Sequence, residues 1–219
     1  MARVVICGVA RTPIGKFRGS LSNLSAVELG IRSVKELLNR CNIDPSSGII
    51  DEVLFGQVLQ SGAGQAPARQ VALGAGLPNT IAATTINKVC GSSLKAVMMA
   101  ANSIKAGEYK AIIAGGMESM TNAPKFEKRN GDEKEMVSTM VHDGLWDVYN
   151  DVHMGNTGEI VANECNISRE KMDAFAARSQ NNAAQAEANG WLIGKDSVCL
   201  NFRVMKELEQ VPQPKHLQV

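Results

Sequence analysis

The chain has 219 residues and a formal net charge of +1, from 23 basic and 22 acidic side chains. Hydrophobic residues make up 44% and charged residues 21% of the sequence, which is typical of a globular protein. The near-zero charge gives no global field to attract nucleic acid or an anionic membrane, and aromatic residues, at 4%, are too few for a base-stacking platform. We therefore expect a globular protein that binds neither.

The first half of the chain alternates between strand and helix patterns. Short β-branched and apolar runs predict strands at residues 3–9, 52–59, 82–87 and 110–114. Amphipathic or alanine-rich patterns predict helices at residues 25–40, 65–75 and 92–106. Strands separated by helices need crossover connections, which indicates an α/β fold with a mostly parallel sheet.

Three details of these elements are also predicted. The first strand is apolar throughout, so we expect it to be buried on both faces. Ser25 is the expected N-cap of the first helix. The helix at 92–106 is expected to turn one apolar set toward the core, namely Leu94, Val97, Met98, Ala101 and Ile104.

The pattern changes after about residue 117. Residues 122–135 are polar and carry mixed charges, so we expect an exposed loop. Helices are predicted at 155–165 and 168–189, and Glu170 in the first turn of the second suits the helix dipole. The residues from Trp191 onward show no clear period.

The cysteines number five and are widely scattered, without a CxxC pair: Cys7, Cys41, Cys90, Cys165 and Cys199. This pattern fits neither a disulfide framework nor a zinc site. Free thiols in a reducing cytosol are the expected state. The sequence contains no recognisable metal site and no dinucleotide-binding fingerprint.

One segment, NKVCGSSLKA at residues 87–96, is the candidate for chemistry. In it a predicted strand ends, a tight turn follows and a helix begins, with Cys90 at the turn. Backbone N–H groups and the positive end of a helix beside such a sulfur favour the nucleophilic thiolate. The same N–H groups could bind a developing oxyanion. The alternative is that Cys90 is a small buried hydrophobe, as free cysteines often are.

The segment from residue 87 to 101 resembles the active-site segment of thiolases of the acetyl-CoA acetyltransferase type. Four other motifs agree in order and spacing: ARTPIG at 10–15, GQVL with GQAPARQ at 56–59 and 64–70, AGGMESMTNAP at 114–124, and DGL with HMGNTGE at 143–145 and 153–159. The resemblance extends from residue 3 to about 190. It implies the N-terminal half of a thiolase, with a mostly parallel or mixed sheet, helices on both faces and a mainly helical loop region.

The resemblance also implies a function and a site. Thiolases transfer acyl groups between coenzyme A thioesters through an acyl-cysteine, which here would form on Cys90. Leu145, His153 and Met154 match positions that line the acyl and pantetheine pocket, and their combination is most similar to short-chain thiolases. Acetyl-CoA, acetoacetyl-CoA and CoA would be substrates, with no cofactor. A cytoplasmic homo-oligomer, with contacts through residues 122–135, is the expected assembly.

The chain is about half as long as a thiolase, whose second half supplies a histidine, an asparagine and a second cysteine to the reaction. His142, His216 and Cys199 match none of these. We expect a core at 1–118 that lacks its last strand, a loop and substrate region at 119–190, and a divergent tail at 191–219. The strand at 110–114 would then form an unpaired edge.

Three functions follow from this reading. The first is an acetyltransferase that is incomplete as a single chain or completed by a chain supplying the other half. The second is a non-catalytic thiolase half that docks on full-length subunits. The third is a related condensing enzyme of the ketoacyl synthase type, which the motifs at 87–96 and 153–155 disfavour.

Overall fold

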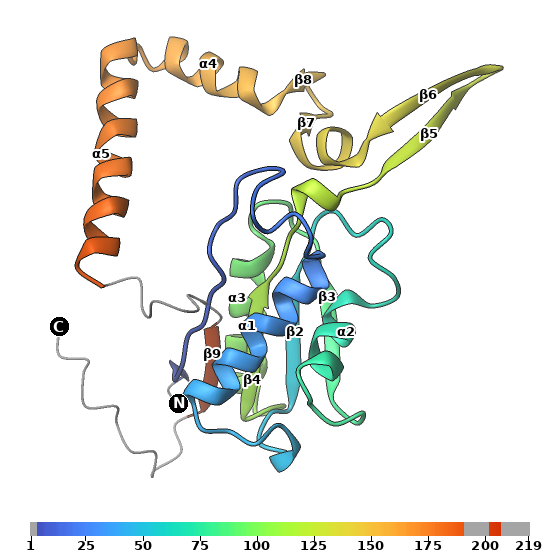
Figure 1. Ribbon diagram of the computed structural model, residues 1–219, viewed down its shortest axis with the longest axis vertical. Helices are drawn as coiled ribbons and strands as arrows, with labels where there is room; N and C mark the ends of the chain where they lie inside the picture. Colours follow the sequence, from blue (N-terminus) through green and yellow to red (C-terminus); the bar gives the residue numbers. More distant parts are fainter. Residues whose placement is uncertain (1–3, 191–201, 207–219) are drawn as a thin grey trace.

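A computed structural model describes residues 4–190 and 202–206 of the chain. Its centre is a five-stranded sheet in the order β1-β9-β4-β2-β3 (Figure 1). The strands are β1 (Val4–Ile6), β2 (Glu52–Gly56), β3 (Ala82–Ile86), β4 (Ala111–Gly116) and β9 (Phe202–Lys206). Strand β2 pairs in parallel with β3 and β4, whereas β9 runs antiparallel to β4 and β1. The sheet is therefore mixed.

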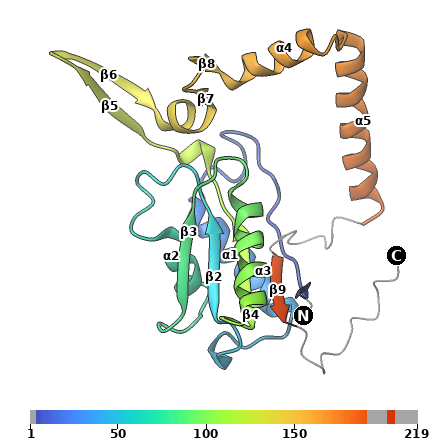
Figure 2. The same cartoon turned by 180° about the vertical axis from the view of Figure 1, so that it is seen from behind.

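Helices cover both faces of this sheet, as the resemblance to thiolases implied (Figures 1 and 2). Helices α1 (Ala26–Arg40) and α2 (Pro67–Gly74) pack on one face, and α3 (Ser92–Ala106) packs on the other. Side chains alternate between faces along a strand. In β2, Val53 and Phe55 accordingly join the cluster with α1 and α2, while Leu54 joins the cluster with α3.

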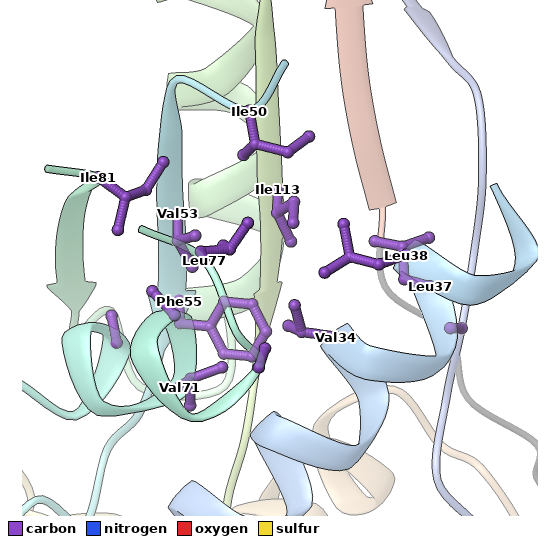
Figure 3. Packing of buried hydrophobic residues seen from close by; sticks show 14 of the residues in the cluster. Val34, Leu37, Leu38, Ile50, Val53, Phe55, Val71, Leu77, Ile81 and Ile113 are labelled. Carbon is purple, nitrogen blue, oxygen red and sulfur yellow. The ribbon is translucent and has the colours of Figure 1, made fainter. Parts of the chain in front are cut away.

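The larger apolar core lies between the sheet and the pair α1 and α2 (Figure 3). Phe55 of β2 is fully buried there, near Val34 of α1 and Val71 of α2, and Leu37 of α1 belongs to the same cluster. The predicted N-cap of α1 is confirmed, because the Ser25 hydroxyl accepts a hydrogen bond from the Glu28 N–H and Glu28 accepts one from the Ser25 N–H. This capping box fixes where α1 begins.

The predicted unpaired edge at 110–114 is wrong. Strand β4 is paired on both sides, because Phe202–Lys206 forms β9 and lies between β4 and β1. The core therefore has a last strand, contributed by the segment that was expected to be a divergent tail. The antiparallel pairing satisfies backbone N–H and C=O groups of β4 that an open edge would expose.

The first strand is shorter and more exposed than predicted. Strand β1 lies at the edge of the sheet, and Ile6 is 52% exposed. The sequence pattern alone does not distinguish an apolar edge strand from a central one, because the position of a strand depends on its pairing with distant segments.

The predicted inner face of α3 is only partly correct. Ile104 is buried, but Leu94 is 66% and Met98 is 50% exposed. Val97 and Ala101 pack against the core cluster as predicted, although they are only partly buried. The fully buried side chains are Ala96, Ala100 and Ile104, at a spacing of four residues, and the small alanines let the helix lie close to the strands.

Residues 122–135 are exposed as predicted, but most of them form a hairpin and not a loop. Strands β5 (Lys125–Asn130) and β6 (Glu133–Ser138) pair in register and project beyond the sheet (Figure 1). Asn130 is still paired with Glu133, so the two turn residues are Gly131 and Asp132, and Gly131 has a φ of +62°. A glycine with positive φ at the first of two turn residues is a hairpin signal that the charged composition of the segment obscured.

The remaining elements form an arm beyond the carboxyl ends of β2, β3 and β4 (Figures 1 and 2). After the short η2 (Met120–Asn122) and the hairpin come the π-helical turn η3 (Met140–Leu145), β7 (Trp146–Asp147) and β8 (Val152–His153). Helices α4 (Met154–Glu164) and α5 (Arg169–Ala188) complete it and confirm the two helices predicted here. A short 3-10 turn, η1 (Pro45–Ser47), follows α1.

Candidate active site

The carboxyl ends of β2, β3 and β4 meet at one edge of the sheet, and α3 begins there. Two strand-end glycines let the first turn of α3 approach closely. A Cβ atom at Gly116 would lie 2.0 Å from the Ser93 Oγ, and one at Gly56 would lie 2.6 Å from the Ser92 Cβ. A side chain at Gly56 would therefore require the backbone at the start of the helix to move, and one at Gly116 would displace at least the Ser93 hydroxyl.

Between β3 and α3 the chain makes a tight, hydrogen-bonded turn. Val89 has a φ of +46°, a left-handed conformation that is rare for a β-branched residue. The Ser92 hydroxyl accepts a hydrogen bond from the Lys88 N–H at 2.8 Å and donates one to the Val89 carbonyl at 2.6 Å. The Asn87 side chain accepts another from the Val89 N–H at 3.0 Å. These bonds hold the strained turn that presents Cys90.

Cys90 is exposed at the top of this turn, and the alternative of a buried structural cysteine is therefore wrong. Gly91 is the N-cap of α3 and provides no side chain to cap it. Within the part of the chain that the structure describes, no acceptor takes the backbone N–H of Cys90. The thiol thus lies beside an available N–H group and at the positive end of a fifteen-residue helix.

Cys90 is among the residues that line a cavity of about 360 Å³. Its walls come from the ends of β2 and β4 and the segments that follow them, the turn between β3 and α3, the first turn of α3 and the end of η3. The apolar side chains that line it are Val58, Leu59, Val89, Met117, Met120 and Leu145. A cavity of this size and character suits a short, mostly apolar group held next to a nucleophile.

Two polar side chains, the buried Gln57 and the half-buried Glu118, organise one wall of this cavity. Glu118 accepts hydrogen bonds from the Val58 N–H at 2.9 Å and the Leu59 N–H at 3.2 Å, through one carboxylate oxygen. The Gln57 amide donates to the Leu59 carbonyl at 3.1 Å. Glu118, just after β4, thus ties the segment after β2 in place and fixes the position of Leu59, whose side chain lies against Gly144.

The four residues predicted for the site are not all in one place. Cys90 and Leu145 line the same cavity, whereas His153 and Met154 are not among the residues that line it. They lie where β8 meets α4. The His153 Nδ1 accepts a hydrogen bond from the Gly155 N–H at 3.0 Å and caps α4, and Met154 is 41% exposed. Their role in binding substrate stays a prediction.

Sequence reasoning did not single out Gln57 and Glu118. Both lie inside motifs that were noticed, GQVL and AGGMESM, but a polar residue within a motif carries no sign of burial. The two glycines that admit α3, Gly56 and Gly116, were likewise visible only as motif letters. Cys199 and His216 lie outside the described residues.

Within residues 4–190 and 202–206, no group of three or more His, Cys, Asp or Glu side chains is arranged to hold a metal ion. None of the helices in these residues has both the length and the apolar character needed to cross a membrane.

Comparison with known proteins places this chain in a family. Residues 4–198 match the family model described as thiolase, N-terminal domain, and the chain belongs to the thiolase family. It is 52% identical over 196 residues to an acetyl-CoA acetyltransferase of Cupriavidus necator, which covers 87% of this chain and 49% of that protein. It is 50% identical over 192 residues to acetyl-CoA acetyltransferase 2 of Arabidopsis thaliana, with 85% and 47% covered.

A probable acetyl-CoA acetyltransferase of Escherichia coli is also 50% identical, over 191 residues that make up 85% of this chain and 48% of that protein. The chain therefore spans about half the length of the curated relatives it matches. The predicted family and the predicted half of it are both confirmed.

Proposed function

We propose that this chain takes part in thiolase-type acetyl transfer between coenzyme A thioesters, with Cys90 as the acyl carrier. The observation that carries the proposal is the geometry at Cys90: an exposed thiol on a strained strand-to-helix turn, at a helix N-terminus and in the lining of a small apolar cavity. Membership of the thiolase family and the names of the relatives support the substrate class.

In the proposed first half-reaction, the Cys90 sulfur attacks the keto carbonyl of acetoacetyl-CoA and forms a tetrahedral oxyanion. The Cys90 N–H is placed to donate to this oxyanion. Cleavage of the carbon–carbon bond leaves acetyl-Cys90, and the departing acetyl-CoA carbanion takes up a proton. In the second half-reaction, the thiol of CoA takes the acetyl group and Cys90 is regenerated with a proton. The reverse sequence joins two acetyl-CoA molecules.

We propose that a second polypeptide is needed for the complete catalytic cycle. This polypeptide is either a second copy of this chain in a homo-oligomer or a chain that supplies the other thiolase half. The exposed side of α3 supports this, since Leu94 and Met98 present apolar surface directly beyond the Cys90 turn. Acetyl-CoA, acetoacetyl-CoA and CoA are the proposed small-molecule partners, without a resident cofactor, nucleic acid or membrane. A cytoplasmic location is proposed with them.

The half-reaction is tested by intact-protein mass after the purified chain is mixed with acetoacetyl-CoA. Addition of one acetyl group to the native chain, absent from Cys90→Ala and retained in Cys165→Ala, is the expected result. No adduct on a chain shown to be folded by circular dichroism would contradict acyl transfer by this chain alone. Adding a thiolase subunit that lacks its own nucleophile then tests whether turnover needs a partner.

A non-catalytic thiolase-half subunit is the second candidate, and the same exposed apolar side of α3 favours it. It predicts that the chain co-elutes with a full-length thiolase subunit equally well with and without Cys90→Ala. Loss of this association in a Leu94→Glu, Met98→Glu double variant would place the contact on α3. Failure to associate with any thiolase subunit would remove this candidate.

A further inference from the structure

The cavity that Cys90 lines contains one side-chain hydroxyl that the turn does not use, that of Ser93. Two serines follow the turn, and both line the cavity. The Ser92 hydroxyl is buried and holds the turn through its bonds to Lys88 and Val89. The Ser93 residue is exposed, and its hydroxyl has no hydrogen-bond partner within the part of the chain that the structure describes.

The other polar side chains in the cavity lining are engaged with the backbone. The Gln57 amide donates a hydrogen bond to the Leu59 carbonyl at 3.1 Å. The Glu118 carboxyl accepts two hydrogen bonds from backbone N–H groups of the segment after β2. Apart from Cys90, the rest of the lining is glycine or apolar, so Ser93 brings the one unengaged hydroxyl to a mostly apolar cavity. In such cavities a few polar groups orient the bound molecule.

The Ser93 hydroxyl lies against the end of β4. Gly116 has no Cβ atom, and one built there would lie 2.0 Å from the Ser93 Oγ. The hydroxyl thus occupies space that a side chain at this strand end would fill. Ser93 is the second residue of α3, and Cys90 precedes the N-cap of the same helix. The thiol and the hydroxyl therefore come from one strand-to-helix turn, three residues apart, at the helix end that favours negative charge.

We infer that Ser93 is a further catalytic residue, whose hydroxyl joins the Cys90 N–H in donating to the oxyanion that forms when Cys90 attacks an acyl carbonyl; this rests on the function proposed above. Cys90 reacts as the thiolate, after its proton has passed to solvent. Its sulfur bonds to the carbonyl carbon, and the π electrons of the carbonyl move to its oxygen. Ser93 keeps its proton, and its hydrogen bond strengthens as this charge develops. When the carbonyl forms again, the leaving group departs with its electron pair.

The test compares two reactions of the same thiol, of which only one forms an oxyanion. p-Nitrophenyl acetate acetylates Cys90 through a tetrahedral oxyanion and releases p-nitrophenolate. Iodoacetamide alkylates Cys90 by displacement of iodide at a saturated carbon. Both rate constants are measured at Cys90 and at Cys165 by peptide mass, after pepsin digestion in acid to preserve the thioester. The acetylation-to-alkylation ratio at Cys90 is divided by the ratio at Cys165, which removes the intrinsic reactivity of the two reagents.

Three variants of Ser93 separate the hydroxyl from the rest of the side chain. Ser93→Ala and Ser93→Gly remove the hydroxyl, whereas Ser93→Thr keeps one. Ser103→Ala is the matched control, because it removes a serine hydroxyl from the same helix at a position that does not line the cavity. Circular dichroism shows which variants are folded.

Ser93→Ala and Ser93→Gly are expected to lower the normalised ratio about tenfold, because a donor to a developing oxyanion has an effect of at least this size. Ser93→Thr and Ser103→Ala are expected to keep the wild-type ratio. If Ser93→Ala does not fold, Ser93→Gly decides.

An unchanged ratio in a folded variant without the hydroxyl overturns the inference, even where both rates fall together, because the effect then lies in the turn and not in the oxyanion. An equal loss in Ser93→Thr also overturns it, since the hydroxyl is then not what matters. Failure of the proposed function is recorded separately, as the absence of an acetyl adduct when the wild-type chain is mixed with acetoacetyl-CoA.

Discussion

Two regions of the molecule meet at the Cys90 cavity, and they are held together in different ways. Residues 4–118 form a layered core in which Val53, Phe55 and Ile113 are fully buried between sheet and helices (Figure 3). In residues 119–190 only Thr139 and Ala162 are buried, and α5 has no buried residue. Cys90 belongs to the first region and Leu145 to the second. The nucleophile is thus fixed by the core, while one wall of its cavity depends on the more exposed part.

The comparison is tested most strongly by two phenylalanines. Phe55 is fully buried in β2 and Phe175 is 64% exposed on α5. Phe55→Ala is expected to lower the free energy of unfolding by about 3–5 kcal/mol, because it leaves a cavity in the core. Phe175→Ala is expected to change it by less than about 0.5 kcal/mol. Urea unfolding followed by circular dichroism measures both. Equal losses of unfolding free energy in the two variants would mean that α5 contributes to the hydrophobic core, which contradicts the comparison.

A pair of glycines tests whether close approach of α3 matters for the site. Gly116→Ala places a Cβ against Ser93 and is expected to cost about 1–3 kcal/mol and to slow alkylation of Cys90. Gly158→Ala in α4 meets nothing within 4 Å and is expected to stabilise its helix by about 0.5–1 kcal/mol. Iodoacetamide labelling and hydrogen exchange report the two effects. Unchanged Cys90 labelling in Gly116→Ala would show that the turn does not need this contact.

Two serine caps make a smaller test of the same contrast. Ser25→Ala removes the capping box of α1 and is expected to cost about 1 kcal/mol of global stability, because α1 packs on the core. Ser168→Ala removes the cap of α5 and is expected to speed hydrogen exchange in α5 alone. A global loss of stability from Ser168→Ala would contradict an independently formed arm.

A pH effect of modest size is expected at the opposite end of the sheet. Burial raises the pKa of Glu52, and the nearby negative charge of Glu108 raises it further. The hydrogen bond that Thr84 donates to the Glu52 carboxylate acts in the opposite direction and lowers this pKa. A carboxyl whose pKa is raised by folding stabilises the fold when protonated, and this stabilisation is lost as the pH rises through the raised value. Glu52→Gln is therefore expected to raise the melting temperature at pH 7 and not at pH 4. An equal change in melting temperature at pH 7 and pH 4 would show that Glu52→Gln acts through packing and not through the carboxyl charge.

The sequence predicted well what local signals determine. The bounds of α3 and the Ser25 cap were correct, because caps and glycines lie next to the elements they end. The order of strands was not predictable in the same way. The pairing of β9 with β4 joins residues about ninety positions apart, and five residues of a tail show no period strong enough to reveal a strand. The exposed edge position of β1 was not predictable for the same reason, because it depends on pairing with β9, which is far away in the sequence.

The site divides in the same manner. Cys90 and Leu145 were found from the motif at the turn and from the family resemblance, and they line one cavity. The charged residues of the β5 and β6 hairpin indicated exposure correctly but hid its strand pairing. Gln57 and Glu118 were missed, because their importance lies in the hydrogen bonds that they form in the three-dimensional arrangement. The sequence gives the type of each residue, but it does not show whether its side chain has a hydrogen-bond partner in the folded chain.

The central claim is that the start of α3 makes Cys90 a nucleophile, and Cys165 supplies an internal control. Both thiols are exposed, but Cys90 precedes the N-terminus of α3 whereas Cys165 is the C-cap of α4. The most direct measurement is the rate of iodoacetamide alkylation at each cysteine, resolved by peptide mass, from pH 6 to pH 9. The account predicts that Cys90 reacts roughly three- to tenfold faster than Cys165 at pH 7, because Cys90 lies beside the N-terminus of one helix and Cys165 lies at the C-terminus of another. Equal rates across this range would contradict it.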